Sequence, residues 1–192
     1  MLFKKNRFKN SCIIILAIII TWQWGQAIMI YSKAHLAKWM IAHAWEQTLT
    51  TGNNIKPWPW ADTWPVAKIL FPNQQSYYVL AGGAGNSLAF GPGHLSSTPL
   101  PGSKGVSVIG GHRDTHFSLL KDIPKKETIK IQTKQGQWKQ YQINKHWIAD
   151  SNKEPLLIDH TTNGIYLITC YPFNALNPRG PQRFIVSAEE II

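Results

Sequence analysis

One cysteine, one histidine and one arginine stand at the ends of strand-like segments, where they could act together. Cys170 ends the run GIYLITC, His112 follows the run GVSVIGG closely, and Arg183 begins the run RFIVSAE. If the runs holding Cys170 and Arg183 form neighbouring antiparallel strands, the end of one lies beside the start of the other. A strand that leads to His112 in the same sheet can bring the imidazole to that place. The spacing therefore predicts a cysteine–histidine–arginine site at one edge of a sheet.

These side chains suit nucleophilic attack on a carbonyl. A cysteine attacks as its thiolate, which a neighbouring imidazolium or guanidinium favours. An arginine can hold a carbonyl or an oxyanion through its fork of donors, and a histidine can protonate a leaving amine. Arg113 and Arg179 are the alternative arginines, and His94 and His116 are the alternative histidines. We prefer Arg183 because it opens a strand, whereas Arg179 lies in the turn sequence NPRGP. We expect His116 to be structural, since it precedes a short apolar segment.

Short strands separated by turns must position this site. The strand candidates, rich in Val, Ile and Tyr, are VAKILF, SYYVLA, GVSVIGG, ETIKIQT, QWKQYQINKHWIA, GIYLITC and RFIVSAE. The stretch KQGQ (134–137) is expected to be a turn between two of them, and residues 115–123 to form one short helix. This pattern predicts an all-β domain, either a sandwich or a closed barrel.

The N-terminal part predicts a membrane anchor. A basic tail, residues 1–11, precedes an apolar stretch, residues 12–31, whose length is close to the ~20 residues that span a bilayer. Trp22, Trp24 and Tyr31 suit a membrane interface. The sequence therefore predicts a single transmembrane helix with the tail in the cytoplasm and the following residues outside.

A cleaved signal peptide is the alternative to a retained anchor. Residues 25–27 and 32–34 weakly match the small-x-small pattern of a cleavage site, although the apolar residues after Ala27 argue against a cut there. Outside the cytoplasm thiols tend to be oxidised and paired. Cys12 would lie in the membrane, out of reach of Cys170, so the sequence predicts a lone and reactive exported thiol.

A helix and a proline-rich segment separate the anchor from the strands. Residues 34–49 have apolar residues at helical spacing, and GNN (52–54) is a plausible end of that helix. We expect residues 32–57 to form a helical linker and residues 58–192 to form the folded domain. The segment KPWPWADTWPV (56–66) is expected to be an extended strap whose tryptophans pack on that domain.

Charge and histidine spacing exclude some functions. The formal net charge is +10, which suggests an anionic partner such as lipid or an envelope polymer. Outside the N-terminal tail there is no dense Lys/Arg run with interleaved aromatics, so solvated basic faces are favoured over nucleic-acid binding. His35 and His43 are expected on a helix face rather than at a metal ion, because no ligand spacing surrounds them. No metal or other cofactor is predicted.

The sequence motifs around the three candidate residues resemble those of the sortase family of cysteine transpeptidases. These motifs are GHRDTHF, LITCYPF and RFIV. HRD also occurs in protein kinases, but no Gly-rich nucleotide loop or DFG accompanies it here. The sortase strand end T-L-x-T-C is matched by LITC ending at Cys170, the family histidine by His112, and the arginine beyond the cysteine by Arg183. Residues 91–114 also look like the family's run into its histidine. The resemblance covers nearly all of residues 58–190 and implies an eight-stranded barrel with short helices.

The resemblance implies a membrane-anchored transpeptidase. Cys170 would cleave an L-P-x-T-G-like sorting signal of a secreted protein between Thr and Gly, and the thioacyl intermediate would be resolved by an amine of the cell envelope. His112 would be the general acid and base, and Arg183 would hold the substrate and the oxyanion. Thr169 would help to position the substrate through its hydroxyl, and Asp114 would orient the histidine loop. A mostly neutral thiol, as the family often has, would suit an exported cysteine.

Within the family, two stretches look most like the Gram-negative, marine-proteobacterial type called class GN. These stretches are KPWPWADTWPVAKI and TCYPFNALNPRGPQRF. This likeness implies a location in the inner membrane with the catalytic domain facing the periplasm.

Three alternative functions involve the same residues or the same basic barrel. A cysteine endopeptidase on the same barrel would use water as the acceptor, and the sequence does not separate it from a transpeptidase. L,D-transpeptidases also use Cys and His, but their S-H-G-C-x-R word is absent here. An anchored basic barrel that only binds would not need Cys170.

Overall fold

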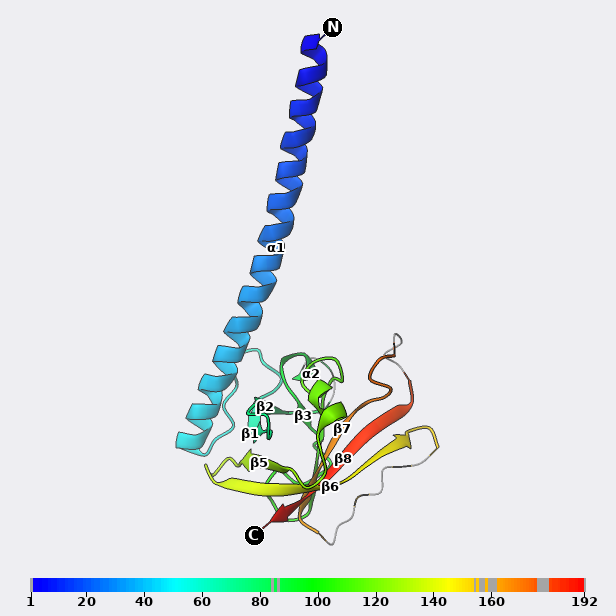
Figure 1. Cartoon of the computed structure of the whole chain (residues 1–192). Helices are drawn as coiled ribbons and strands as arrows, with labels where there is room; N and C mark the ends of the chain where they lie inside the picture. Colours follow the sequence, from blue (N-terminus) through cyan, green and yellow to red (C-terminus); the bar gives the residue numbers. More distant parts are fainter. Residues whose placement is uncertain are drawn as a thin grey trace. The chain divides into compact units, whose positions relative to one another are not determined.

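The structure is a computed structural model, and it contains one long helix and a closed β-barrel (Figure 1). It describes residues 2–83, 85, 87–153, 155, 158, 162–175 and 180–191, with side chains in the long helix described for residues 10 and 13–51. In chain order the elements are α1 (Leu2–Thr51), β1 (Pro65–Leu70), β2 (Ser76–Ala81), α2 (Ser87–Phe90), β3 (Gly93–His94), β4 (Val106–Gly110), the 3₁₀ helix η1 (Ser118–Asp122), β5 (Thr128–Gln132), β6 (Trp138–Asp150), β7 (Gly164–Cys170) and β8 (Gln182–Ile191).

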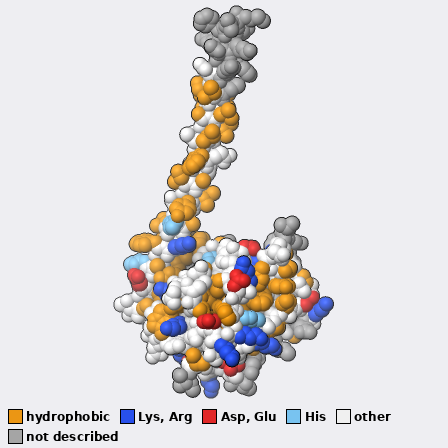
Figure 2. Space-filling view, viewed as in Figure 1, with side chains coloured by type: hydrophobic (Ala, Val, Ile, Leu, Met, Phe, Trp, Pro, Cys, Tyr) orange, Lys and Arg blue, Asp and Glu red, His pale blue; other side chains and the backbone are white. Residues whose placement is uncertain are grey.

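The chain divides into two compact units, residues 1–39 and residues 40–192, and the division falls within helix α1. In the first unit, large apolar side chains are exposed on all sides of the helix, among them Ile14 (60%), Ile18 (61%) and Trp22 (69%). Figure 2 shows hydrophobic side chains along the described part of α1. Among the described residues this is the one helix long and apolar enough to cross a membrane, and a signal sequence would meet the same criteria.

The C-terminal part of α1 packs within the second unit. Ile41, Ala44, Trp45 and Thr48 are buried at the i, i+3, i+4, i+7 spacing of one helix face. The Trp45 indole Nε1 donates a hydrogen bond to Oε1 of Gln132 at the end of β5, 3.1 Å away.

The expected helix over 34–49 is the continuation of α1, which runs without a break from the apolar stretch to Thr51. Gly52 follows with a φ of +72° and donates its N–H to the Thr48 carbonyl at 2.9 Å. This left-handed conformation suits glycine, so the expected end of the helix near residue 52 is confirmed.

Eight strands close the barrel in the order β1-β2-β3-β4-β7-β8-β6-β5. The β2–β3 and β4–β7 pairs are parallel, and the other pairs are antiparallel. This topology confirms the predicted eight-stranded barrel. Seven strands match the predicted runs, and the turn expected at 134–137 joins β5 to β6, with Gly136 at a φ of +81°. The strand missing from the prediction is β3, which has two residues.

Alternating apolar residues of the strands fill the barrel interior. In β7, Ile165 and Leu167 are fully buried, whereas Tyr166 and Ile168 are half-buried on the outer face. The largest fully buried side chains are Tyr141, Phe71, Phe117, Ile69, Leu80, Ile109, Leu120, Ile129, Ile131, Ile143, Ile165 and Leu167. This packed core fixes the strand ends that carry the candidate site.

Two local expectations need correction. In the strap, Trp58 packs edge-on against Phe90 and Trp64 packs against the core, but the Trp60 side chain is 83% exposed. The strap therefore does not pack all of its tryptophans. The short helix expected over 115–123 is a 3₁₀ helix of five residues, Ser118–Asp122, because residues 113–117 instead form a turn.

Candidate active site

The antiparallel pairing of β7 and β8 brings Cys170 beside Arg183. The two residues are directly paired in the register, at the last position of β7 and near the first of β8. Figure 1 shows these two strands side by side. Directly opposed residues of an antiparallel pair have Cα atoms about 4.5–5.5 Å apart. The expected neighbouring of these strands is confirmed.

The parallel pairing of β4 and β7 brings the histidine segment to the same place. Gly110 is paired with Ile168, and the Gly111 N–H continues the ladder by donating to the Ile168 carbonyl at 3.0 Å. The Thr169 hydroxyl, which is buried, donates to the Gly111 carbonyl at 2.7 Å. His112 therefore directly follows a residue whose N–H and carbonyl are both hydrogen-bonded to the strand of Cys170.

A tight turn holds the backbone of His112. The His112 carbonyl accepts the N–H of Phe117 at 3.0 Å and, more weakly, that of Thr115 at 3.4 Å. The Phe117 ring is fully buried, and a Cβ added to Gly111 would lie 2.7 Å from it. Glycine is needed at position 111 for this close approach, while the imidazole of His112 is exposed and accessible to a substrate.

Arg113, predicted only as an alternative to Arg183, is a buried cation. Its side chain is 4% exposed, and its Nη1 and Nη2 donate to the carbonyls of Pro172 and Ala175 at 2.8 and 2.7 Å. Its Nε lies 3.4 Å from a carboxylate oxygen of Asp114, a side chain that is 69% exposed. The position of Arg113 next to His112 was the only signal in the sequence, and it does not distinguish a buried side chain from an exposed one.

Arg183 is half-buried, and its guanidinium lies against its own loop. Its Nη1 donates to the Gly180 carbonyl at 2.6 Å and to the Gln182 carbonyl at 2.8 Å. The remaining guanidinium donors make Arg183 able to bind a carbonyl oxygen beside Cys170. Arg179, the alternative arginine, lies outside the described residues.

The alternative histidines lie in other surroundings. His116 packs edge-on against Tyr77 with ring centroids 5.3 Å apart. His94 is buried in β3, where its Nε2 lies 2.9 Å from the Pro99 carbonyl oxygen, and burial lowers its pKa. In the β3–β4 register His94 is paired with Ile109, a residue of the core. His94 is therefore part of the barrel wall.

Residues that follow Cys170 and Arg183 in the chain form an aromatic cluster. Tyr171 stacks on Phe184 with centroids 6.3 Å apart, and Phe173 meets Phe184 edge-on at 5.3 Å. Cys170 itself is a free thiol and half-buried. Cys170 ends the strand that lies between the strand of Arg183 and the strand that leads to His112, and a partly exposed thiol at such a place can attack a bound acyl group.

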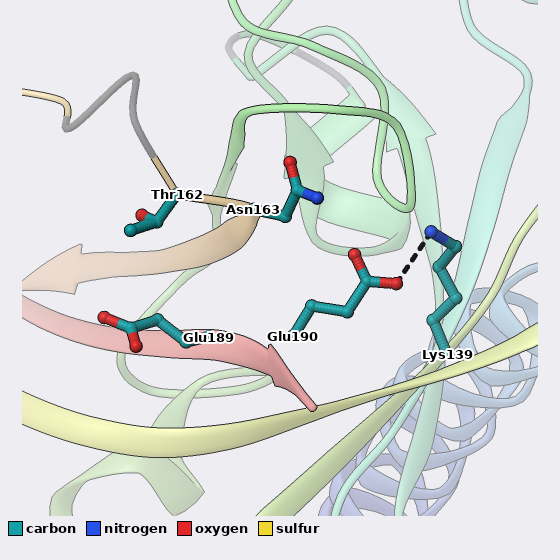
Figure 3. A pocket seen from close by; sticks show the side chains of 5 residues that line it. All are labelled: Lys139, Thr162, Asn163, Glu189 and Glu190. Atoms are coloured by element: carbon teal, nitrogen blue, oxygen red, sulfur yellow. Dashed lines mark ion pairs between the residues drawn. The ribbon is translucent and has the colours of Figure 1, made fainter. Parts of the chain in front are cut away.

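A separate cavity of about 400 Å³ lies at the other end of β7 (Figure 3). Its lining residues are Lys139, Thr162, Asn163, Glu189 and Glu190. Lys139 and Glu190 form an ion pair of 2.7 Å across it. Gly164 at the start of β7 pairs with Glu189, and six residue steps of about 3.3 Å place Cys170 roughly 20 Å away. This cavity is not part of the candidate site.

Comparisons with known proteins agree with the barrel. A model of the sortase domain matches residues 72–191. Sortase D of Bacillus subtilis (strain 168) is 27% identical over 114 residues, which are 59% of this chain and 57% of that protein. The structure of sortase A from Corynebacterium diphtheriae is similar with a TM-score of 0.60 and 27% identity, over 69% of this chain and 63% of that one. This chain thus spans less than two thirds of these two relatives.

A third similarity shows the fold alone. The structure of a sortase D5 transpeptidase from Clostridium perfringens matches with a TM-score of 0.64 and 22% identity, over 82% of this chain and 99% of that one. The barrel is therefore of the sortase type. The match to the sortase domain also covers more than half of the residues of this chain. The chain therefore belongs to the sortase family, whose members are cysteine transpeptidases.

Proposed function

We propose that this protein is a membrane-anchored transpeptidase that joins a secreted protein to an amine of the cell envelope. The secreted partner carries a C-terminal L-P-x-T-G-like sorting signal, which is cut between Thr and Gly. The observation that carries this proposal is the direct pairing of Cys170 with Arg183, next to the turn that bears His112. Membership of the sortase family supports the same chemistry.

The first half of the proposed reaction acylates the enzyme. His112 takes the proton of the Cys170 thiol, and the resulting thiolate attacks the carbonyl carbon of the signal's threonine while Arg183 donates hydrogen bonds to the developing oxyanion. The carbon–nitrogen bond to glycine breaks, and His112 gives a proton to the leaving amine. A thioester between Cys170 and the threonine remains.

The second half transfers the acyl group. The acceptor amine attacks the thioester carbonyl, and His112 takes a proton from the amine. The carbon–sulfur bond breaks and a new amide joins the secreted protein to the acceptor. The exposure of His112 supports both proton transfers, because neither the leaving nor the entering amine has to penetrate the core.

Thr169 and Asp114 help to hold the segment that carries His112. The Thr169 hydroxyl, which was expected to position the substrate, is buried and would act indirectly, through the Gly111 carbonyl that precedes His112. Asp114 lies beside Arg113 and so contributes to the conformation of the histidine loop. The outer face of β7, where Tyr166 and Ile168 are half-buried on the same side as Cys170, is a suitable floor for an extended peptide.

The proposed location is the inner membrane of a Gram-negative bacterium of the class GN type, with the catalytic domain in the periplasm. Residues 1–11 are the cytoplasmic tail, 12–31 the anchor, 32–57 the helical linker and 58–192 the catalytic domain. The exposed apolar side chains of α1, such as Ile14 and Ile18, support an anchor because water solvates them poorly.

Intact mass spectrometry tests the proposal. The full-length protein in detergent micelles is mixed with an L-P-x-T-G peptide, and Cys170→Ala serves as the matched control. We expect an adduct of the peptide cut after threonine, absent from the variant and released by hydroxylamine or an added amine. Release only by water, with no amine product, would favour the endopeptidase instead. An unreactive Cys170, with no adduct and no alkylation by iodoacetamide, would reject both.

A further inference from the structure

A single buried side chain connects the two segments that bear the candidate catalytic residues. Arg113 directly follows His112, and its guanidinium binds the carbonyls of Pro172 and Ala175, in the loop that leaves Cys170. Burying a guanidinium is costly unless its donors are satisfied. A buried arginine that spends two donors on backbone carbonyls therefore fixes the position of that backbone.

The geometry of this contact requires the planar fork of arginine. The two carbonyl oxygens are bound by different terminal nitrogens, at 2.8 and 2.7 Å, and lie three residues apart in the chain. A lysine ammonium is a single point donor on a flexible stem and does not reproduce this arrangement. Hydrogen bonds from a charged donor are also stronger than neutral ones, so the loop is held firmly.

The contact completes a ring of bonds around the site. On the strand side, Gly111 is bonded to Ile168 and Thr169. On the loop side, Arg113 is bonded to the residues that follow Cys170. The histidine segment is thus hydrogen-bonded to the cysteine segment at residues before Cys170 and again at residues after it.

We propose that Arg113 is a positioning residue, which holds the loop after Cys170 so that the thiol and His112 reach the same acyl group. It does not touch the substrate. This inference rests on the proposed function, because the acyl group in question is that of the sorting signal.

The test compares Arg113→Gln and Arg113→Lys with the wild type, in the full-length protein in detergent micelles. Lys121→Gln is the control, because it removes one positive charge from an exposed side chain of η1 without touching the loop. Steady-state kinetics with an L-P-x-T-G peptide and an amine are measured for each protein, well below its own unfolding temperature.

We expect Arg113→Gln to lower kcat about 100-fold with little change in KM, since a displacement near 1 Å can have such an effect. Arg113→Lys should recover about a tenth of the lost rate, because it keeps the charge but not the fork. Lys121→Gln should behave as the wild type. Folded Arg113→Gln with a wild-type kcat would overturn the proposal, and if that variant does not fold, a wild-type kcat of Arg113→Lys would overturn it.

A second measurement needs no sorting substrate, so it separates a failure of this inference from a failure of the proposed function. Hydrogen exchange of residues 171–175 and the rate of Cys170 alkylation by iodoacetamide are followed in the same proteins. If the wild type accepts no sorting peptide, the proposed function fails. Faster exchange and an altered alkylation rate in Arg113→Gln would still establish that Arg113 positions the loop, whereas wild-type values of both would refute it.

Discussion

Replacing Thr169 by valine tests how the histidine segment is held. The Thr169 hydroxyl is buried and donates to the Gly111 carbonyl at 2.7 Å, one residue before His112. Valine keeps the shape of the side chain and removes the donor. The substitution therefore leaves the packing of β7 nearly intact while it releases one fixed point of the histidine segment.

The expected magnitude follows from the burial of this bond. A hydrogen bond of this kind contributes about 0.5–1.5 kcal/mol net, and leaving a buried acceptor without its donor costs about 1–3 kcal/mol. We expect a loss of about 1–2 kcal/mol in the free energy of unfolding, which lowers Tm by roughly 3–6 °C in a domain of this size. We expect kcat/KM to fall about tenfold, less than for a displacement of a full ångström.

The assay is transpeptidation of an L-P-x-T-G peptide, measured at a temperature where both proteins are folded. Thr169→Ser is the matched variant, because it keeps the hydroxyl and loses only a methyl group, a change of about 1 kcal/mol in stability. If Thr169→Val and Thr169→Ser show the same kcat/KM, the hydroxyl does not position the histidine segment and the reasoning is refuted.

Three further predictions concern separate parts of the molecule. Gly111→Ala should lower both Tm and kcat, because its Cβ would lie 2.7 Å from the fully buried Phe117 ring; a wild-type Tm and rate would show that the ring moves freely. His94 has a pKa below its ordinary value of 6.5 because it is buried, so the unfolded chain binds its proton more readily and stability should fall as the pH drops below 6.5. Between pH 7 and pH 5, roughly the range in which histidine titrates, denaturant unfolding of His94→Gln should show a smaller loss in the free energy of unfolding than the wild type. An identical loss in the two proteins would contradict this. Replacing both Ile18 and Ile19 by lysine should move the full-length protein from the membrane pellet to the soluble fraction, since each lysine costs about 3 kcal/mol at the centre of a spanning helix; unchanged fractionation would argue against an anchor.

Much of the site was predictable from local sequence. Cys170 and Arg183 could be placed together because each marks the end of a strand with a clear apolar pattern, and two such strands joined by a loop commonly pair. His112 could be placed because it follows a third apolar run closely. Their catalytic roles remain predictions, which the sequence motifs GHRD and LITC and membership of the family support.

The role of Arg113 was not predictable in the same way. Arg113 and Arg183 are both arginines beside a candidate catalytic residue, and side-chain chemistry alone does not separate them. Their difference arises when the loop after Cys170 folds over Arg113 and presents the carbonyls of Pro172 and Ala175. Burial depends on residues 59 and 62 positions away, which no local pattern specifies.

By itself, the sequence determined the elements whose causes are local. These are the apolar N-terminal helix, its end at Gly52, and seven strands with alternating apolar residues. Only the tertiary structure decided that β4 pairs in parallel with β7, that the two residues of β3 form a strand, and that Trp60 remains exposed. The physical reason is that propensity and alternation act over a few residues, whereas pairing and burial depend on which distant segments meet when the barrel closes.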